Sequence, residues 1–213
     1  MPRARFERLE PEKQARILEA ATEEFAARGF EGASYNQIIE KAGVSKGAMY
    51  YYFDDKMDLF CTVVKRASSH MTELWGAALD SEALESDFWG TFEDIARKQA
   101  AFAFEHPEMM ALGKSLMELD PALVRQGPLG EVYALTRTWI GRIMARGQAA
   151  GAVRDDIPLE LLVALLQGVG EAFDRWFVAH FEETMSGDPE ALVQMTVDVF
   201  RRIASPAGQE VRR

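Results

Sequence analysis

Apolar residues recur along the chain at intervals of three and four positions, the spacing that places side chains on one face of a helix. Stretches that alternate apolar and polar residues, as half-buried strands do, are nearly absent. Each of the eight prolines lies at the edge of a helical pattern, where its missing N–H breaks no hydrogen bond. We therefore predict an all-α protein of nine helices. The expected helices span residues 12–28, 35–42, 46–52, 55–79, 88–106, 107–118, 129–150, 158–183 and 189–203.

The second and third of these helices are short and are separated by the turn Ala42-Gly43-Val44-Ser45. Gly43 suits the positive φ that ends a helix, and Val44 is placed to fill the core between the two helices. Ser45 is a favoured N-cap residue, and it leaves the first amide groups of the next helix pointing outward. This pattern predicts a helix-turn-helix, in which the second helix enters the DNA major groove by its N-terminal end.

Over about residues 10–60 the chain resembles the TetR family of bacterial transcriptional regulators. The resemblance rests on a first helix that ends in Arg-Gly-Phe and on about a dozen further positions. These positions are Ile38, Ala42-Gly43-Val44-Ser45-Lys46-Gly47, Tyr50, Tyr52-Phe53, Lys56 and Leu59. Two residues depart from the family pattern, because Ile39 stands where alanine is usual and Tyr35 replaces a small hydroxyl residue. The resemblance implies a helix-turn-helix DNA-binding domain over residues 1–55 and a helical ligand-binding and dimerisation domain over residues 56–213.

Residues at the start of the two short helices are placed to contact DNA. Lys46 offers an ammonium group and Gly47 an uncovered backbone, and both suit a close approach to phosphate at a helix N-terminus. Lys56 matches the family's phosphate contact. The predicted DNA-contacting residues are Ser34, Tyr35, Asn36, Ser45, Lys46, Gly47, Ala48, Tyr50, Tyr51 and Lys56.

Aromatic residues in this segment have two interpretations. Tyr50 and Tyr51 either touch base edges, thymine methyl groups and phosphates or belong to the core, and we favour contact with DNA. Phe53 is expected in the core, whereas Tyr52 fits either role.

Charge is distributed unevenly along the chain. The sequence carries 24 Lys and Arg against 34 Asp and Glu, a formal net charge of -10, which taken alone argues against nucleic-acid binding. Residues 1–66 hold 11 of each sign, so the whole acidic excess falls on residues 67–213, which need no contact with phosphate. Within the N-terminal part, Arg3 and Arg5 form either a basic arm for the minor groove or a solubilising tail.

The remainder of the chain combines bulky apolar side chains with a few polar ones at inward-facing positions. Gln99 and Thr136 lie on the apolar stripes of their helices, and Gln167 interrupts an apolar run. Buried polar groups need partners, which either the core or a bound small molecule can supply. The family resemblance implies a pocket between these helices and favours the small molecule. The predicted ligand-binding residues are Trp75, Phe92, Gln99, Phe102, Met110, Met117, Thr136, Trp139, Gln167, Phe173 and Trp176.

The last two helices carry more apolar surface than one chain would bury. Residues 161–166 are apolar throughout, and Gly168 and Gly170 would let another helix approach closely. Such an excess predicts an isologous homodimer with a four-helix interface, which the family resemblance also implies. The predicted interface residues are Leu162, Leu166, Val169, Phe173, Phe177, Leu192, Met195, Val199 and Ile203.

Other classes of function receive little support. The three histidines are scattered, and we find no metal-ligand spacing, phosphate-binding glycine loop or Ser-His-Asp pattern, so we expect no enzyme, metal or cofactor. No apolar run exceeds six residues, so we expect no membrane span. The single cysteine, Cys61, and the lack of a signal-peptide core favour the cytoplasm.

Together these features predict a homodimeric transcriptional regulator that binds a pseudo-palindromic operator in double-stranded DNA and is released by a small, largely apolar ligand. Repression is the favoured sign of regulation. The alternatives are an activator, a helix-turn-helix dimer without a ligand, and an interaction adaptor that has lost DNA binding. The intact Lys46, Gly47 and Lys56 argue against the adaptor.

Overall fold

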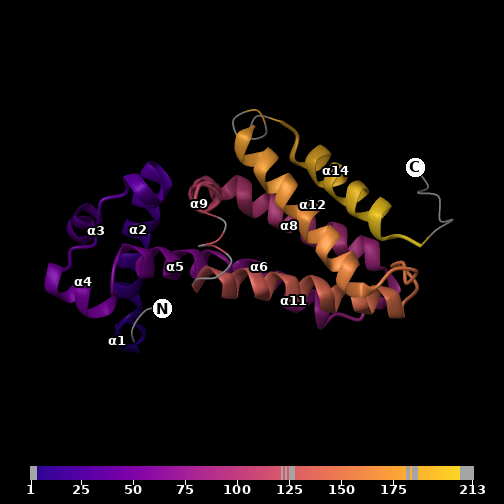
Figure 1. The fold of residues 1–213 in the computed structure, drawn as a ribbon, viewed down its shortest axis with the longest axis horizontal. Helices are drawn as coiled ribbons and strands as arrows, with labels where there is room; N and C mark the ends of the chain where they lie inside the picture. Colours follow the sequence, from indigo (N-terminus) through magenta and orange to yellow (C-terminus); the bar gives the residue numbers. More distant parts are fainter. Residues whose placement is uncertain are drawn as a thin grey trace. The chain divides into compact units, whose positions relative to one another are not determined.

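The computed structural model describes residues 4–120, 122, 124, 128–180, 183 and 187–206, and the regular structure in these residues is helical (Figure 1). No strand occurs among them, which confirms the predicted all-α class. The chain divides into two compact units. The first comprises residues 1–69 and 106–133, and the second comprises residues 70–105 and 134–213.

The first unit is built around one long helix, α2. Its helices are α1 (Ala4–Glu7), α2 (Pro11–Gly32), α3 (Tyr35–Lys41), α4 (Lys46–Tyr52), α5 (Lys56–Ala67) and α9 (Pro107–Met117). Helix α2 packs against α3, α5 and α9, and α4 packs against α1 and α3. The two short helices of the predicted helix-turn-helix are therefore held on a support made by the longer ones.

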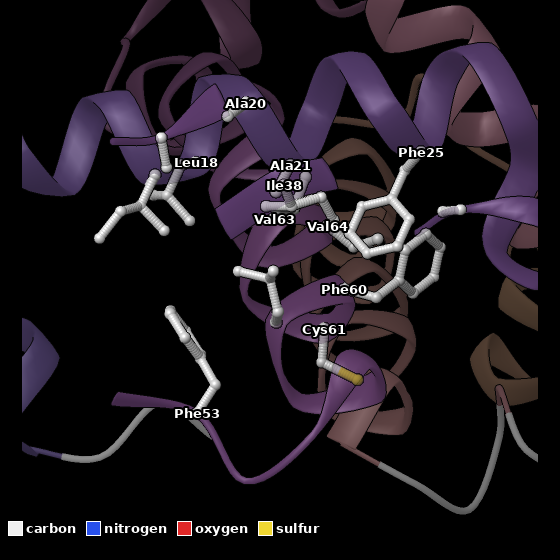
Figure 2. Close-up of a cluster of buried hydrophobic side chains, with 14 of the residues drawn as sticks. Leu18, Ala20, Ala21, Phe25, Ile38, Phe53, Phe60, Cys61, Val63 and Val64 are labelled. Atoms are coloured by element: carbon white, nitrogen blue, oxygen red, sulfur yellow. The ribbon is translucent and has the colours of Figure 1, made fainter. Parts of the chain in front are cut away.

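Apolar residues on the inner face of α2 explain why these helices assemble. Ile17, Ala21 and Phe25 recur at helical spacing and are fully buried. The Phe25 ring meets the Phe60 ring of α5 edge-on, with the ring centroids 4.9 Å apart (Figure 2). Ser115 of α9 donates its hydroxyl to the Phe25 carbonyl at 3.0 Å. This unit therefore has a hydrophobic core of its own. Each fully buried large apolar side chain in it contributes about 1.5–3 kcal/mol to the free energy of folding.

The second unit contains the remaining helices. These are α6 (Ser69–Leu79), α7 (Ala83–Ser86), α8 (Phe88–Glu105), α11 (Pro128–Ala149), α12 (Leu159–Ala179) and α14 (Pro189–Ala204), and the division between the units falls within α6 and α11. Helix α8 packs against α7 and α14, and α14 also packs against α12. Phe92 of α8, Ile143 of α11 and Leu162 of α12 belong to one buried cluster. This unit also has its own core.

Local chemistry sets the helix starts where the sequence predicts them. Ser34, Ser45 and Asp55 each accept a backbone N–H from three residues further along, and so they cap α3, α4 and α5. Gly29 has a φ of +66° and breaks the helical path of α2 where the sequence places its end, although a further turn carries the helix to Gly32.

Three helical features differ from the expectation. The helix expected over residues 55–79 is interrupted at Ser68, whose hydroxyl donates to the Val64 carbonyl at 2.8 Å, so α5 and α6 are separate. Helices α1 and α7 were not expected, because four residues are too few to show a periodic pattern. Helix α12 ends at Ala179, and residues 181–182 of the expected longer helix lie outside the described residues.

The compact unit that holds the helix-turn-helix extends beyond residue 55, because α5 and α9 share its core. Phe60 of α5 and Leu112 of α9 are members of the same buried cluster as Phe25 of α2. This division follows packing alone, and a functional boundary at residue 55 remains a prediction.

Candidate nucleic-acid interface

The turn between α3 and α4 has the geometry of a helix-turn-helix. Gly43 has a φ of +65°, a conformation that residues with a Cβ rarely adopt, and its N–H donates to the Glu40 carbonyl at 3.1 Å. The Val44 N–H donates to the Ile39 carbonyl at 3.3 Å, and the half-buried Val44 side chain packs against the core. The turn thus fixes the direction in which α4 leaves α3.

Helix α4 presents one face to the core and another to solvent. Met49 is fully buried and Tyr52 is 8 % exposed, whereas Tyr50 and Tyr51 are 46 % and 48 % exposed. Phe53, which follows the helix, is fully buried, as its expected place in the core requires. Two tyrosine side chains are therefore exposed on a helix whose other side is anchored.

The N-terminal end of α4 is open to a partner. Ser45 accepts the Ala48 N–H at 3.1 Å, while Lys46 and Gly47 are exposed. A Cβ added at Gly47 would meet no atom of the described residues within 4 Å, apart from the backbone of its own helix and the two neighbouring residues. This end of α4 combines an exposed cation with an uncovered stretch of backbone, as contact with a phosphate requires.

The start of α3 is held in place by a residue of α2. The Ser34 N–H donates to Glu24 Oε1 at 3.0 Å, and the Ser34 hydroxyl accepts the Gln37 N–H at 3.4 Å. Asn36, in the first turn, is exposed. The role of Glu24 was not predicted, because nothing in a helical pattern marks which surface carboxylate will meet a backbone amide ten residues away.

Tyr35 lies differently from the two exposed tyrosines. Its ring centroid is 5.3 Å from that of Tyr50, and its hydroxyl oxygen is buried and has no hydrogen-bond partner among the described residues. Burial raises the pKa of the Tyr35 phenol well above its usual range, and nearby Tyr50, Asp55 and Asp58 add to the shift. Tyr35 therefore stays protonated and supports Tyr50 by packing. Contact between its hydroxyl and a phosphate would require the side chain to turn outward.

Lys56 is engaged by the protein itself. Its Nζ donates to the Glu31 and Ala33 carbonyls, at 3.1 Å each, and lies 4.8 Å from the centroid of the Phe30 ring. These contacts tie the start of α5 to the segment that joins α2 and α3. An ammonium group has three donors, so the two carbonyls leave capacity for one phosphate oxygen.

Acidic residues of α2 engage two other cations of this unit. Glu23 pairs with Lys41 at the end of α3, and Glu24 Oε1 lies 3.2 Å from Arg28 Nε. Helix α4 itself has one basic residue, Lys46, and no acidic residue. The outward positive charge of α4 is therefore carried by a single side chain.

The short helix α1 packs against α4. Phe6 is 3 % exposed, and its ring centroid is 4.7 Å from that of Phe53. The Arg5 guanidinium lies 4.2 Å from the centroid of the exposed Tyr51 ring. The sequence left Arg5 as part of either an arm or a tail, and a lone phenylalanine in a polar stretch was the available signal for a packed helix. Arg3 lies outside the described residues.

The residues predicted to bind a ligand are divided between the two units. Met110 and Met117 lie on α9 in the first unit, the former half-buried and the latter exposed. Thr136 and Trp176 lie in the second unit and are exposed in this chain.

The other predicted ligand-binding residues are buried or half-buried in the second unit. Phe92 and Gln167 are buried. The half-buried ones are Trp75, Gln99, Phe102, Trp139 and Phe173. The Gln99 amide donates to the sulfur of Met71, an exposed side chain of α6, so the protein itself supplies at least one of its partners.

The residues predicted for a dimer interface fall into three groups by their exposure. Leu162 and Leu166 have almost no exposed surface, because they fill the core of the second unit, so they have nothing to offer a second chain. Met195 is 41 % exposed. The half-buried ones are Val169, Phe173, Phe177, Leu192, Val199 and Ile203. Apolar exposure on α12 is instead carried by Leu161 and Leu165, with Trp176 further along the helix.

No helix in the described parts of the chain is long and apolar enough to cross a membrane. In the same residues, no group of three or more His, Cys, Asp or Glu side chains is arranged to hold a metal ion.

The family model described as "Bacterial regulatory proteins, tetR family" matches residues 17–62. This range begins within α2 and ends within α5, so it includes the whole helix-turn-helix.

Two transcriptional regulators are similar to this chain in sequence, one over most of its length and one over less than a third of it. The HTH-type transcriptional repressor AcnR of Corynebacterium glutamicum is 27% identical over 162 residues, which cover 74% of this chain and 77% of AcnR. The HTH-type transcriptional regulator SrpR of Pseudomonas putida is 40% identical over 63 residues, which cover 30% of this chain and 29% of SrpR. Among solved structures, the transcriptional regulator FadR from Bacillus subtilis in complex with stearoyl-CoA superposes with a TM-score of 0.72 at 15% identity. That superposition covers 87% of this chain and 96% of the FadR chain.

Proposed function

Because this chain belongs to the TetR family of bacterial transcriptional regulators, we propose that it is a homodimeric cytoplasmic repressor whose N-terminal domain binds a pseudo-palindromic DNA operator. A small, largely apolar ligand bound in the C-terminal domain releases it from that operator.

The observation that carries this proposal is the two-faced character of α4. Its buried residues fix the helix on the first unit, while Lys46, Gly47, Tyr50 and Tyr51 lie exposed. Lys46 and the backbone at Gly47 suit phosphate, and the two phenol groups suit base edges, thymine methyl groups or phosphate. A helix presented in this way by a helix-turn-helix reads the major groove.

The exposed apolar residues of α12 support the homodimer. Leu161, Leu165 and Trp176 are 50 %, 46 % and 45 % exposed, and with Gly168 they lie along one face at helical spacing. A Cβ added at Gly168 would meet nothing within 4 Å in the described chain beyond its own helix and neighbours, so a second helix can approach there. A two-fold axis through this face would cover the same stripe on both chains, because an isologous interface uses one patch twice.

The half-buried aromatic and amide residues of the second unit support a ligand site there. The FadR structure contains stearoyl-CoA, so a protein of similar fold binds a molecule with a long apolar part. In the proposed mechanism the ligand favours a dimer whose two DNA-binding domains no longer match the operator half-sites. The ligand can shift this equilibrium only by its difference in affinity for the two states.

Selection of bound sequences from random double-stranded DNA by the purified protein tests the proposal. We expect an enriched inverted repeat whose half-sites are centred about one helical turn, or a multiple of it, apart. Enrichment of no sequence, or of a single asymmetric site, would contradict the proposed function.

A further inference from the structure

Three tryptophans pack on the hydrophobic core of the second unit, and they differ in whether the indole N–H group has a hydrogen-bond acceptor. Trp89 of α8 donates to the Ala152 carbonyl at 3.2 Å. The Nε1 atoms of Trp75 on α6 and Trp139 on α11 are buried, yet no described residue accepts a hydrogen bond from either. Folded proteins seldom leave a buried donor without an acceptor, so two such donors in one unit need an explanation.

The side chains of Trp75 and Trp139 lie close to each other in this unit. Cη2 of Trp139 is 3.6 Å from the place where a Cβ would stand on Gly76, the residue that follows Trp75. The Trp139 ring therefore packs against α6 at Gly76, next to Trp75. The Trp75 ring in turn meets the buried Phe92 ring edge-on, with the centroids 6.5 Å apart. The donors are therefore set in an apolar surrounding, where a hydrogen bond is stronger than in water.

A cation lies beside the Trp139 ring. The Arg142 guanidinium lies one turn along α11 and is 5.1 Å from the centroid of the Trp139 ring. A cation beside the Trp139 indole favours an acceptor with negative charge and disfavours an ammonium group.

We propose that Trp75 and Trp139 donate their indole N–H groups to an oxygen of the ligand, which is an apolar molecule with a carbonyl or carboxylate group. This inference rests on the proposed ligand-binding function and names the chemistry of that ligand. The apolar part of the molecule packs against aromatic side chains such as Phe92, and the oxygen satisfies the donors that the protein leaves without an acceptor.

The proposal is tested by titrating the full-length protein with three ten-carbon probes below their micelle concentrations. Decanoate has a charged acceptor, methyl decanoate has a neutral acceptor, and decylammonium has donors only. Isothermal titration calorimetry measures the affinity, and tryptophan fluorescence of the wild type reports contact with the indoles. We expect decanoate and methyl decanoate to bind saturably, and decylammonium to bind at least tenfold more weakly.

Variants separate hydrogen bonding from packing, because phenylalanine keeps an apolar ring and removes the N–H. Trp75→Phe and Trp139→Phe should each weaken binding of the two acceptor-bearing probes about tenfold and leave decylammonium unchanged. Trp89→Phe is the matched control. It removes an N–H that the Ala152 carbonyl already accepts, so it should lower the melting temperature more than the other two and leave the preference among probes intact.

Three results would overturn the inference. They are equal binding of decylammonium, an equal loss of affinity in all three variants, and binding of none of the probes. Selection of DNA sequences with the same preparation keeps this inference distinct from the proposed function. If an inverted repeat is selected but the probes do not discriminate, the ligand chemistry alone is wrong, whereas failure to select any sequence contradicts the regulator itself.

Discussion

We predict the same partner, a DNA phosphate, for two lysines of the first unit, but the side chain of only one of them also donates hydrogen bonds to described residues of the protein. Lys46 is exposed at the start of α4. The ammonium of Lys56 already donates to the carbonyls of Glu31 and Ala33. A substitution at Lys56 should therefore affect folding, and one at Lys46 should affect only binding.

We expect Lys46→Gln to leave the free energy of unfolding within about 0.5 kcal/mol of the wild type. It should weaken DNA binding on all sequences and make the slope of log K against log salt shallower by about 0.9, as loss of one phosphate contact predicts. Lys56→Gln should destabilise the protein by about 1–3 kcal/mol, because it removes a charged donor from two carbonyls. Urea unfolding and fluorescence anisotropy at several salt concentrations measure both quantities. An unchanged salt slope in Lys46→Gln would remove Lys46 from the interface.

Gly47 gives a second test at the same scale, because the protein itself has room for a side chain there. Gly47→Ala should keep stability or raise it by up to about 1 kcal/mol, since alanine is the better helix former. It should nevertheless weaken DNA binding by roughly tenfold, because the added methyl group stands between the helix backbone and the phosphate. Gly113→Ala on α9 is the matched control. A Cβ there also meets no described atom within 4 Å, apart from the backbone of its own helix and the two neighbouring residues. Equal affinities of the two variants would show that α4 does not approach DNA closely at this position.

Residue roles were predictable where the cause is local. Ser45 and Gly43 act through backbone groups within three or four residues, so sequence alone indicates their conformations. The surroundings of Tyr35 and Lys56 were not predictable, because they depend on groups 15 to 25 residues away that only the folded core brings close.

The helices themselves follow from the spacing of apolar residues and from their caps, and the main disagreement concerns α1. Its four residues have no periodicity, yet Phe6 is buried against Phe53, and Gln14 of α2 donates to the Glu7 and Leu9 carbonyls at 3.2 and 2.9 Å. This helix therefore braces the C-terminal end of α4.

Phe6→Ala should lower the free energy of unfolding by about 3 kcal/mol, because it leaves a cavity beside a fully buried ring. Phe6→Leu keeps most of the volume and should cost less than about 1.5 kcal/mol. Circular dichroism during urea unfolding measures both. If Phe6→Ala were as stable as the wild type, α1 would not be packed on α4 in solution.

At the scale of the whole molecule, the acidic excess and the exposed apolar stripe belong to the part of the chain for which we propose no contact with DNA. Residues 1–66 are balanced in charge and the remainder is strongly acidic, so we expect contact with phosphate to be confined to the few cations placed for it. The apolar repeat predicted a dimer, but it could not separate Leu162 and Leu166 from Leu161 and Leu165. All four lie in one apolar run, and packing within the second unit decides which pair is left outside.

Replacing both exposed leucines, Leu161→Asp with Leu165→Asp, should convert a particle of twice 23.9 kDa into one of 23.9 kDa, as measured by light scattering after gel filtration. Charges at a buried interface lack partners, but in the separate chain both positions remain in water. Leu135→Asp replaces a leucine that is 43 % exposed on α11 and should leave the mass unchanged. A double variant that keeps the dimer mass would place the interface elsewhere.

In the proposed function, two copies of α4 bind one operator together. Its most direct test is the affinity of the wild-type protein for the selected full operator, compared with the same duplex in which one half-site is scrambled. We predict at least a 100-fold loss of affinity on scrambling, since losing one of two linked contacts removes the gain from simultaneous engagement. Affinities within twofold of each other would show that the two copies of α4 do not bind the operator together.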